Sequence, residues 1–215
     1  MLWIVCSIAN QVVRVDERTG KLLGRTATGP DPVDVTIGFG SAWTANLQDD
    51  TITRIDEHTA HAVKTIKVPD GVVRVSAGRT AVWVTGKQNT LRRIDPRTDV
   101  VTGDPITVGA GPLGVDASGA LVWVAVENDH QVTGIDPALR APKGPFTVGG
   151  NPAEIAQAGA KVWTTDAQGK LVASVDIASG AVSSTPIDAT PARIAWSGTA
   201  VWVACVDPDE LVRLT

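Results

Sequence analysis

The chain has 215 residues, of which 43% are hydrophobic, a share that is ordinary for a globular protein and too high for a disordered one. Its formal net charge of -4 argues against nucleic acids and anionic membranes as partners, because both require a basic surface. No apolar run approaches the roughly 18 residues of a membrane span, and residues 1–6 lack the basic start and long apolar core of a signal peptide. We therefore expect no membrane span, and no export signal is visible in this chain.

Tryptophan recurs along the chain at an almost constant spacing. It stands at positions 3, 43, 83, 123, 163 and 202, so the steps are 40, 40, 40, 40 and 39 residues. Each of these tryptophans lies in a short run of β-branched and small residues, such as residues 81–85. A period of about 40 residues is typical of repeat proteins and is the strongest signal in the sequence.

The third repeat unit shows the elements that each unit is expected to contain. A strand at residues 81–85 is followed by a polar turn and by a second strand at 90–95, which ends in an acid. After a tight turn at Pro96, a third strand covers about 100–108, and a fourth covers 113–116. Short strands with regular turn signals and no helical period predict an all-β fold.

A single four-stranded sheet cannot bury both of its faces, so successive units must cover one another. Radial stacking of such sheets is the solution found in β-propellers, whose blades have about 40 residues. The repeat therefore predicts a β-propeller, and it places the repeat tryptophans in the core between blades.

The repeat resembles a known family in three segments. The pattern Val-Trp-Val-Ala is followed by Val-x-Arg-Ile-Asp-Pro-x-Thr-Gly and then by Val-Gly-x-x-Pro-x-x-Val, as in bacterial YVTN/NHL-type β-propellers. That family includes streptogramin lyase-like proteins and the sensor domains attached to bacterial serine/threonine kinases. The resemblance covers essentially the whole chain. It implies the fold but not one activity, because the family has several functions.

In that family the strand that opens with proline is the innermost, and the tryptophan strand follows it. The resemblance therefore implies that the chain starts with the outer three strands of a first blade, at about 1–28. It then completes blades two to five, at about 29–187, and ends with the inner three strands of a sixth blade, at about 188–215. We expect one domain with six blades and about 22 strands. The incomplete ends leave open a five-bladed ring, an oligomer that completes the ring, or a fragment of a larger ring.

Acidic residues are concentrated in the turns after the tryptophan strands. These acids are Asp49, Asp50, Glu127, Asp129, Asp166, Asp207, Asp209 and Glu210. Lys87 is a cation in these turns, and Asp31, Asp70 and Asp188 add further acids from the turns that enter the inner strands. The propeller topology therefore predicts an acidic face that would bind a cationic partner, and an opposite face of mixed or basic charge.

The acidic turns lack the spacing of a calcium-binding loop, so we predict no metal site and no cofactor. If a hard cation did bind, carboxylates in these turns would be its ligands. The candidates are Asp49, Asp50, Asp129, Asp207 and Asp209.

The residue two positions after the proline alternates in charge from blade to blade. It is Asp34, Arg74, Gly114, Glu154 and Arg193 in successive units. Asp34 beside Arg74, and Glu154 beside Arg193, predict ion pairs between neighbouring inner strands that would enforce the register. The alternative is a ligand site at the mouth of the channel, where the two arginines hold a small anion and Gly114 leaves space. These five residues are our candidate ligand-binding site.

Two further residue types recur with the repeat. Arginine follows the tryptophan strand at Arg14, Arg54, Arg93 and Arg213, where we expect it to pair with the acid two residues on or to cover a tryptophan face. Cys6 and Cys205 occupy equivalent positions in the first and last copies. Equivalent positions on packed sheets lie about 10 Å apart, which is too far for a disulfide, so we expect two free thiols.

The histidines test whether the chain is an enzyme. Streptogramin lyase-like enzymes rely on histidine and glutamate at the propeller surface, together with a divalent metal. The resemblance thus makes His130 and Glu127, which share an acidic turn, the candidate acid–base pair of a metal-dependent C–O lyase. His58 and His61 lie in a hairpin turn with no evident third metal ligand. The chain has no Gly-x-Ser-x-Gly elbow and no phosphate-binding loop.

We therefore predict a propeller that acts by binding a protein or a small molecule at the acidic face or the channel mouth. Such a protein would be an extracytoplasmic sensor or interaction module of a bacterium. The alternatives are a lyase of the streptogramin type and a purely structural propeller fragment. We expect function at the positions where the repeat breaks, which are Gly114, His130, Glu154 and the extra Trp196.

Overall fold

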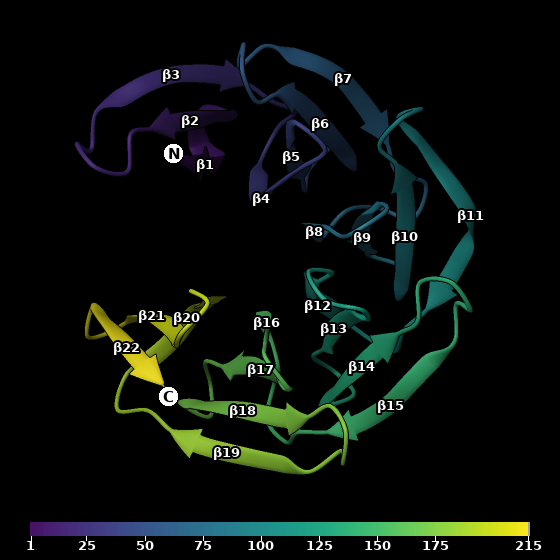
Figure 1. Cartoon of the computed structure of the whole chain (residues 1–215), viewed down its shortest axis with the longest axis vertical. Helices are drawn as coiled ribbons and strands as arrows, with labels where there is room; N and C mark the ends of the chain where they lie inside the picture. Colours follow the sequence, from purple (N-terminus) through teal and green to yellow (C-terminus); the bar gives the residue numbers. More distant parts are fainter. Residues whose placement is uncertain (215) are drawn as a thin grey trace. The chain divides into compact units, whose positions relative to one another are not determined.

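The computed structural model describes residues 1–214, which are built almost entirely of β-strands (Figure 1). It confirms an all-β fold of the β-propeller class with six blades, each of which is an antiparallel sheet of strands consecutive in the sequence. The strands group into two compact units, unit 1 (Met1–Ile106) and unit 2 (from Thr107 onward). No helix within residues 1–214 has the length and apolar character that crossing a membrane requires.

Unit 1 contains the first three blades. Blade 1 has the strands β1 (Leu2–Cys6), β2 (Gln11–Val15) and β3 (Leu22–Ala27), with the 3-10 helix η1 (Ser7–Ala9) after β1. Blade 2 has β4 (Pro32–Gly38), β5 (Ser41–Asn46), β6 (Thr51–Asp56) and β7 (Ala62–Lys67). Blade 3 has β8 (Arg74–Ala77), β9 (Val82–Gly86), β10 (Thr90–Asp95) and β11 (Val100–Thr107). We call β4, β8 and their equivalents the inner strands.

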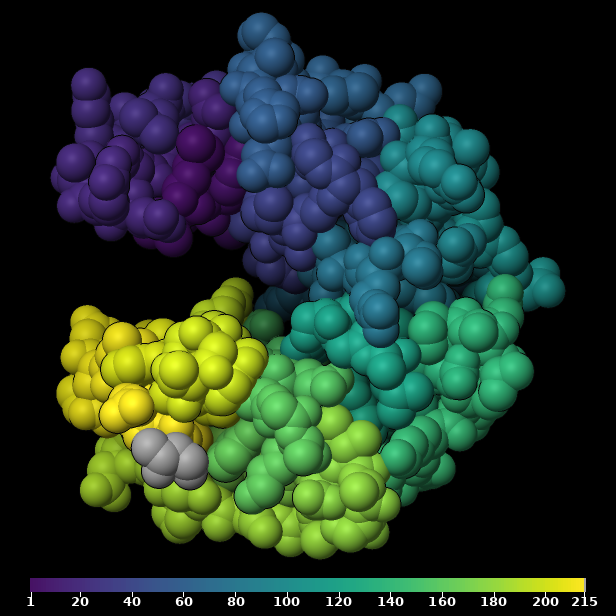
Figure 2. All heavy atoms as spheres, viewed as in Figure 1, coloured from purple at the N-terminus to yellow at the C-terminus, as the bar shows by residue number. Residues whose placement is uncertain are grey.

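Unit 2 contains the last three blades, which pack side by side in the space-filling view (Figure 2). Blade 4 has β12 (Pro112–Asp116), β13 (Val122–Val126), β14 (Gln131–Ile135) and β15 (Pro142–Thr147). Blade 5 has β16 (Ile155–Ala158), β17 (Lys161–Asp166), β18 (Leu171–Asp176) and β19 (Val182–Pro186). Blade 6 has β20 (Thr190–Trp196), β21 (Val201–Val206) and β22 (Glu210–Leu214).

The terminal blades are incomplete, as the phase of the repeat predicts. Within residues 1–214, the sheet of blade 1 runs from β1 to β3 without an inner strand, and that of blade 6 runs from β20 to β22 without an outer strand. Except at Trp163, which is half-buried in the complete blade 5, the burial of the repeat tryptophans follows this pattern. Trp43 and Trp123 in complete blades are fully buried, whereas Trp3 and Trp202 in the terminal blades are half-buried.

The recurring arginine stands directly opposite the tryptophan on the next strand. Arg54 pairs with Trp43 in the β5–β6 register, and its guanidinium carbon lies 5.0 Å from the centroid of the indole ring. The equivalent distances are 5.6 Å for Arg14 over Trp3 and 5.9 Å for Arg213 over Trp202. Of the two predicted roles, covering the tryptophan face is therefore confirmed in these three blades.

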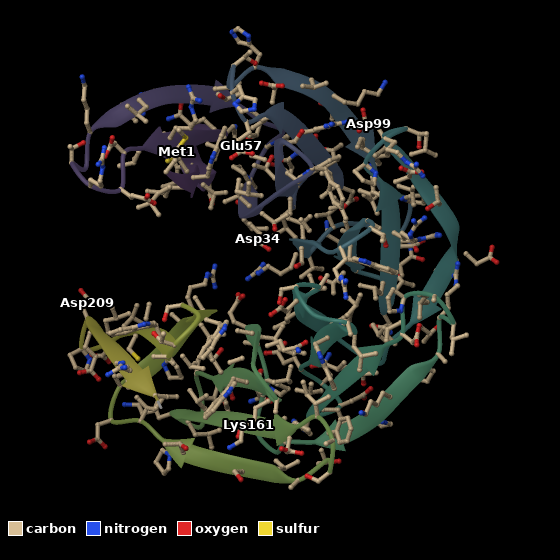
Figure 3. All side chains as sticks on the ribbon, in the orientation of Figure 1. Met1, Asp34, Glu57, Asp99, Lys161 and Asp209 are labelled. Carbon is tan, nitrogen blue, oxygen red and sulfur yellow. The ribbon has the colours of Figure 1, made fainter. Side chains whose placement is uncertain are left out.

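Arg54 also joins two blades. Its Nη1 atom donates to the carbonyl oxygen of Pro96 at 3.0 Å and forms an ion pair with the Asp99 carboxylate at 2.8 Å. Both partners belong to the turn between β10 and β11, and Asp99 is labelled there in Figure 3. The arginine thus covers its own tryptophan and ties blade 2 to blade 3.

Blades 4 and 5 lack this arginine and cover their tryptophans by other means. In blade 4, Gly134 is opposite Trp123, and a β-carbon on this glycine would lie 2.9 Å from the indole ring. Phe146 packs against the same indole with ring centroids 6.1 Å apart. In blade 5, Ser174 takes the place opposite Trp163, whose ring is approached instead by the Lys161 ammonium at 5.5 Å.

The acid that recurs after this strand caps a turn. Asp56 Oδ1 accepts hydrogen bonds from the backbone N–H groups of His58 at 3.1 Å and Thr59 at 2.7 Å. Asp16 and Asp176 accept the equivalent bonds in their own turns. These backbone donors lower the pKa of all three carboxyl groups, because they stabilise the charged form. The repeat acids are therefore structural.

The two cysteines are free thiols, as predicted. Cys6 is half-buried at the end of β1, and Cys205 is buried in β21. Burial, assisted by the charge of Glu210, raises the pKa of the Cys205 thiol, so this group stays protonated and unreactive near neutral pH.

Candidate functional site

The turns after the tryptophan strands lie against the loops that enter the inner strands, as the topology predicts. In unit 2, Glu127 N–H donates to the Gly111 carbonyl oxygen at 2.9 Å, and Ala110 N–H donates to Asp129 Oδ2 at 2.8 Å. Because such bonds join a turn to a loop of the same blade, both lie at one end of the strands. We call the surface that they form the turn face.

Two of the four acids of the turn face in unit 1, Asp50 and Asp70, are paired with cations. Asp50 lies 2.7 Å from Lys87 Nζ and 3.8 Å from Lys67 Nζ. The Lys87 ammonium lowers the pKa of the Asp50 carboxyl group. The pairing of Lys67 was not predicted, because this lysine comes from the end of the outer strand β7 rather than from a turn.

Asp70 forms the most buried of these ion pairs. The Arg92 guanidinium binds it through Nε and through Nη2, which lies 3.0 Å from Asp70 Oδ1. Both side chains are mostly buried, with relative exposures of 13% for Asp70 and 12% for Arg92. The arginine lowers the pKa of Asp70 from its ordinary value of 3.8. Arg92 directly precedes the repeat arginine Arg93, and no feature of the sequence marked it as the partner of Asp70.

This pair predicts a loss of stability in acid. A carboxyl group whose pKa is lowered by folding stabilises the native state above its unfolded pKa, and that stabilisation is lost as the pH falls through the folded pKa. The unfolding free energy of the wild type should therefore drop below about pH 3.9. Asp70→Asn should be less stable near neutral pH and should show a shallower drop in acid. Denaturant titrations at several pH values would check this; parallel pH profiles for the two proteins would contradict it.

The turn face of unit 2 carries carboxylates without cationic partners. Asp129 is bound by Ala110 N–H, and Asp166 Oδ1 accepts from Gly169 N–H at 2.8 Å. The other acids form no side-chain hydrogen bond or ion pair with any of residues 1–214. These five are Glu127, Asp188, Asp207, Asp209 and Glu210; Asp209 is labelled in the turn between β21 and β22 (Figure 3). These five acids outnumber Lys170, a cation in the turn between β17 and β18, so this surface is acidic.

The metal candidates do not gather into a coordination shell. Asp49 accepts a hydrogen bond from the Thr51 hydroxyl at 2.8 Å, while Asp50 and Asp129 are bound as described above. Asp207 and Asp209 are exposed. In the described part of the chain, residues 1–214, no three His, Cys, Asp or Glu side chains are grouped so that they would hold a metal ion.

Glu154 and Arg193 form the ion pair that the alternating charges predict. Arg193 Nη1 lies 2.7 Å from Glu154 Oε1 and joins blade 6 to blade 5. The glutamate is mostly buried, whereas the arginine is 59% exposed. The guanidinium is thus held in place by the glutamate and still open to solvent.

In unit 1, the Asp34 carboxylate binds the backbone of the next blade. Its Oδ2 atom accepts a hydrogen bond from Val75 N–H at 3.0 Å, which connects the inner strand β4 to the inner strand β8 (Figure 3). Asp116 binds Gln157 N–H in the same way in unit 2, at 2.6 Å. Arg74 donates to the Val73 carbonyl oxygen at 3.0 Å. The carboxylate of Asp34 thus takes part in the register between two blades.

Gly114 leaves no room for a ligand, and our expectation on this point was wrong. Its N–H donates to the Ala153 carbonyl oxygen at 2.7 Å. A β-carbon on Gly114 would lie 2.6 Å from that oxygen and 3.0 Å from the α-carbon of Glu154. The missing side chain lets the backbone of blade 5 approach blade 4, so the space is already filled.

His130 and Glu127 are not arranged as an acid–base pair. The Nδ1 atom of His130 is hydrogen-bonded to the Gly150 carbonyl oxygen, and its backbone N–H donates to the Glu127 carbonyl oxygen at 3.1 Å. Within residues 1–214 the Glu127 carboxylate makes no side-chain contact with the histidine. The imidazole therefore links the turn to the loop that enters β16.

Comparison with known proteins supports the fold. No family model matches the sequence, and no curated protein matches it. Among solved structures, the chain is similar to hydrazine synthase of Kuenenia stuttgartiensis, with a TM-score of 0.80 and 17% identity over 94% of this chain and 70% of that one. It is also similar to a chain of the mitotic checkpoint complex, with a TM-score of 0.80 and 14% identity over 96% and 71%.

The WD40 domain of Neurospora crassa Pan2 gives a TM-score of 0.74 and 14% identity, and the match covers 96% of this chain and 72% of that one. At such low identity these likenesses establish the propeller fold alone. Propellers of this class commonly serve as protein-interaction modules.

Proposed function

We propose that this protein is a non-catalytic binding propeller whose acidic turn face in unit 2 binds a cationic segment of a partner protein. The observation that carries the proposal is the set of five carboxylates in unit 2 that have no cation beside them. An excess of unpaired charge speeds association with a partner of opposite charge and selects against acidic partners. The exposed Arg193, held by Glu154, lies at the same end of the strands and would bind a carboxylate of that partner.

Asp34 and Arg74 lie near the turn-face ends of β4 and β8, at the positions that Glu154 and Arg193 hold in unit 2. We therefore include them as candidate binding residues of unit 1. We also propose that the protein is a sensor or interaction module of the YVTN/NHL type, formed by a single extracytoplasmic domain. This part of the proposal rests on the repeat pattern. A lyase activity has no supporting contact at His130 and Glu127.

The test is binding of a synthetic peptide that alternates lysine and glycine, with a glutamate–glycine peptide as its control. The basic peptide should bind, and its affinity should fall when salt is raised from about 50 to about 300 mM, because salt screens exposed charges. The double variant Asp207→Asn, Glu210→Gln should weaken binding about fivefold at low salt, because each exposed charge contributes up to about 1 kcal/mol.

Glu17→Gln, Glu57→Gln is the matched control. It changes the net charge by the same amount, but in turns of unit 1 at the opposite end of the strands. This variant should bind the basic peptide within about twofold of wild type. Equal losses in both double variants would show that only the net charge matters, and they would refute a site on the turn face of unit 2.

A further inference from the structure

The other end of the strands in unit 2 holds a hollow with two tryptophan walls. Its volume is about 310 Å³, and it lies between blades 5 and 6. Trp163 of β17 and Trp196 at the end of β20 line it, together with Lys161 and small apolar side chains. Lys161 starts the strand that Asp166 ends, so the hollow is at the end opposite the turn face.

In other blades, the residue at the position of Trp196 closes the gap between two neighbouring blades. The residue six before the repeat tryptophan is Ala77 in blade 3, where its β-carbon fills the space beside Gly38. In blade 5 it is Gln157, whose Oε1 atom accepts the indole N–H of Trp123 in blade 4 at 3.2 Å. In blade 6 it is Trp196, which neither fills the gap nor accepts a hydrogen bond, so the hollow stays open.

The indole N–H of Trp163 is without a partner. The N–H groups of Trp43, Trp123 and Trp202 donate to acceptors in the protein, at 3.0, 3.2 and 3.3 Å. That of Trp163 forms no hydrogen bond with any of residues 1–214. A half-buried donor that lines an open hollow is therefore free to bind a ligand oxygen.

The Lys161 ammonium provides a positive charge at the same place. It lies 5.5 Å from the centroid of the Trp163 ring and forms no ion pair within residues 1–214. The nearest facing acid is Asp176, opposite Lys161 in the β17–β18 register, and its Oδ1 atom is occupied by the N–H and hydroxyl groups of Ser179. The Ser179 hydrogen bonds and, to a smaller extent, the charge of Lys161 lower the pKa of Asp176, but Lys161 forms no ion pair with this carboxylate and lines the hollow, where it can pair with an anionic group.

We propose that this hollow binds a small aromatic carboxylate. The ring would stack against Trp163 and Trp196, and its carboxylate would pair with Lys161 and accept the Trp163 indole N–H. A volume of about 310 Å³ suits a molecule of one or two rings. This site is separate from the turn face, so its ligand and the cationic partner would bind independently.

The test uses indole-3-acetate as the probe, with indole and acetate as its matched parts. Each tryptophan gives one indole N–H signal in a ¹H–¹⁵N spectrum, and the signals of Trp163 and Trp196 are assigned with Trp163→Phe and Trp196→Phe. Indole-3-acetate should shift these two signals and leave the others in place. It should bind more tightly than indole, and acetate should not bind.

Three variants separate the contribution of the charge from that of the aromatic wall. Lys161→Met keeps an apolar stem and should weaken indole-3-acetate binding about fivefold while leaving indole unchanged. Lys170→Met, the same substitution at the turn-face end of blade 5, should leave both unchanged. Trp196→Ala removes an exposed wall and should abolish binding of both ring compounds, with the remaining indole signals unmoved as proof of folding. Absence of the two shifts, or equal affinity in the Lys161→Met variant, would overturn the proposal.

Discussion

Replacing Trp123 with alanine should lower the free energy of unfolding by about 3–5 kcal/mol, the range for truncating a fully buried aromatic side chain. The indole is 0% exposed, packs against Phe146 and occupies the space that a side chain at Gly134 would need. Its N–H also binds Gln157 of the next blade. The substitution therefore leaves a cavity between blades 4 and 5 and an unpaired acceptor.

Trp202→Ala in the same unit is the matched control. Trp202 occupies the equivalent place in β21, but it is only half-buried. Its replacement should cost clearly less than that of Trp123. Urea titrations followed by circular dichroism would measure both; equal losses would mean that the Trp202 face is covered as completely as that of Trp123.

Gly114→Ala should destabilise the protein by about 1–3 kcal/mol, the range for forcing extra atoms into a packed core. The new methyl group would meet the Ala153 carbonyl oxygen at 2.6 Å, and neither that backbone nor Glu154 beside it can move aside as a flexible side chain would. The strain should separate β12 from the loop that enters β16, and it should weaken the Gly114 N–H bond to Ala153.

Gly24→Ala provides the comparison for this change. Gly24 also lies in a strand, but a β-carbon there meets only the Arg14 side chain, at an ordinary 3.6 Å. That variant should be neutral or slightly stabilised, because alanine restricts the unfolded chain. Thermal unfolding would compare the two; a Gly114→Ala protein as stable as Gly24→Ala would restore the idea that Gly114 leaves space for a ligand.

The fold could be predicted because one sequence period of about 40 residues recurs along the whole chain. The spacing of the tryptophans predicted the blades, and the resemblance to YVTN/NHL-type propellers supplied the order of the strands from the inner to the outer one. The stacking of Arg54 on Trp43 followed from their recurrence, since residues that repeat together on adjacent strands face each other. The Glu154–Arg193 pair was foreseen for a similar reason, because equivalent positions of neighbouring inner strands are close together.

The candidate site was less predictable, because it depends on how long side chains and backbone segments meet between blades. Lys67 and Arg92 neutralise acids of the turn face from strands whose own pattern is unremarkable in sequence. Gly114 looked like a gap because a sequence does not show how closely the next backbone approaches. The hollow at Trp163 is lined by Trp196, which takes the position that Ala77 holds in blade 3 and Gln157 holds in blade 5.

The proposal of an acidic binding surface is tested most directly by locating a bound cationic peptide. Hydrogen exchange should be measured with and without the lysine–glycine peptide. We expect slower exchange in the turn-face segments of unit 2, at 127–130, 187–190 and 206–210, with no change at 137–141. Protection confined to 137–141, or the same exchange with and without peptide at saturating concentration, would contradict a cationic partner on this face.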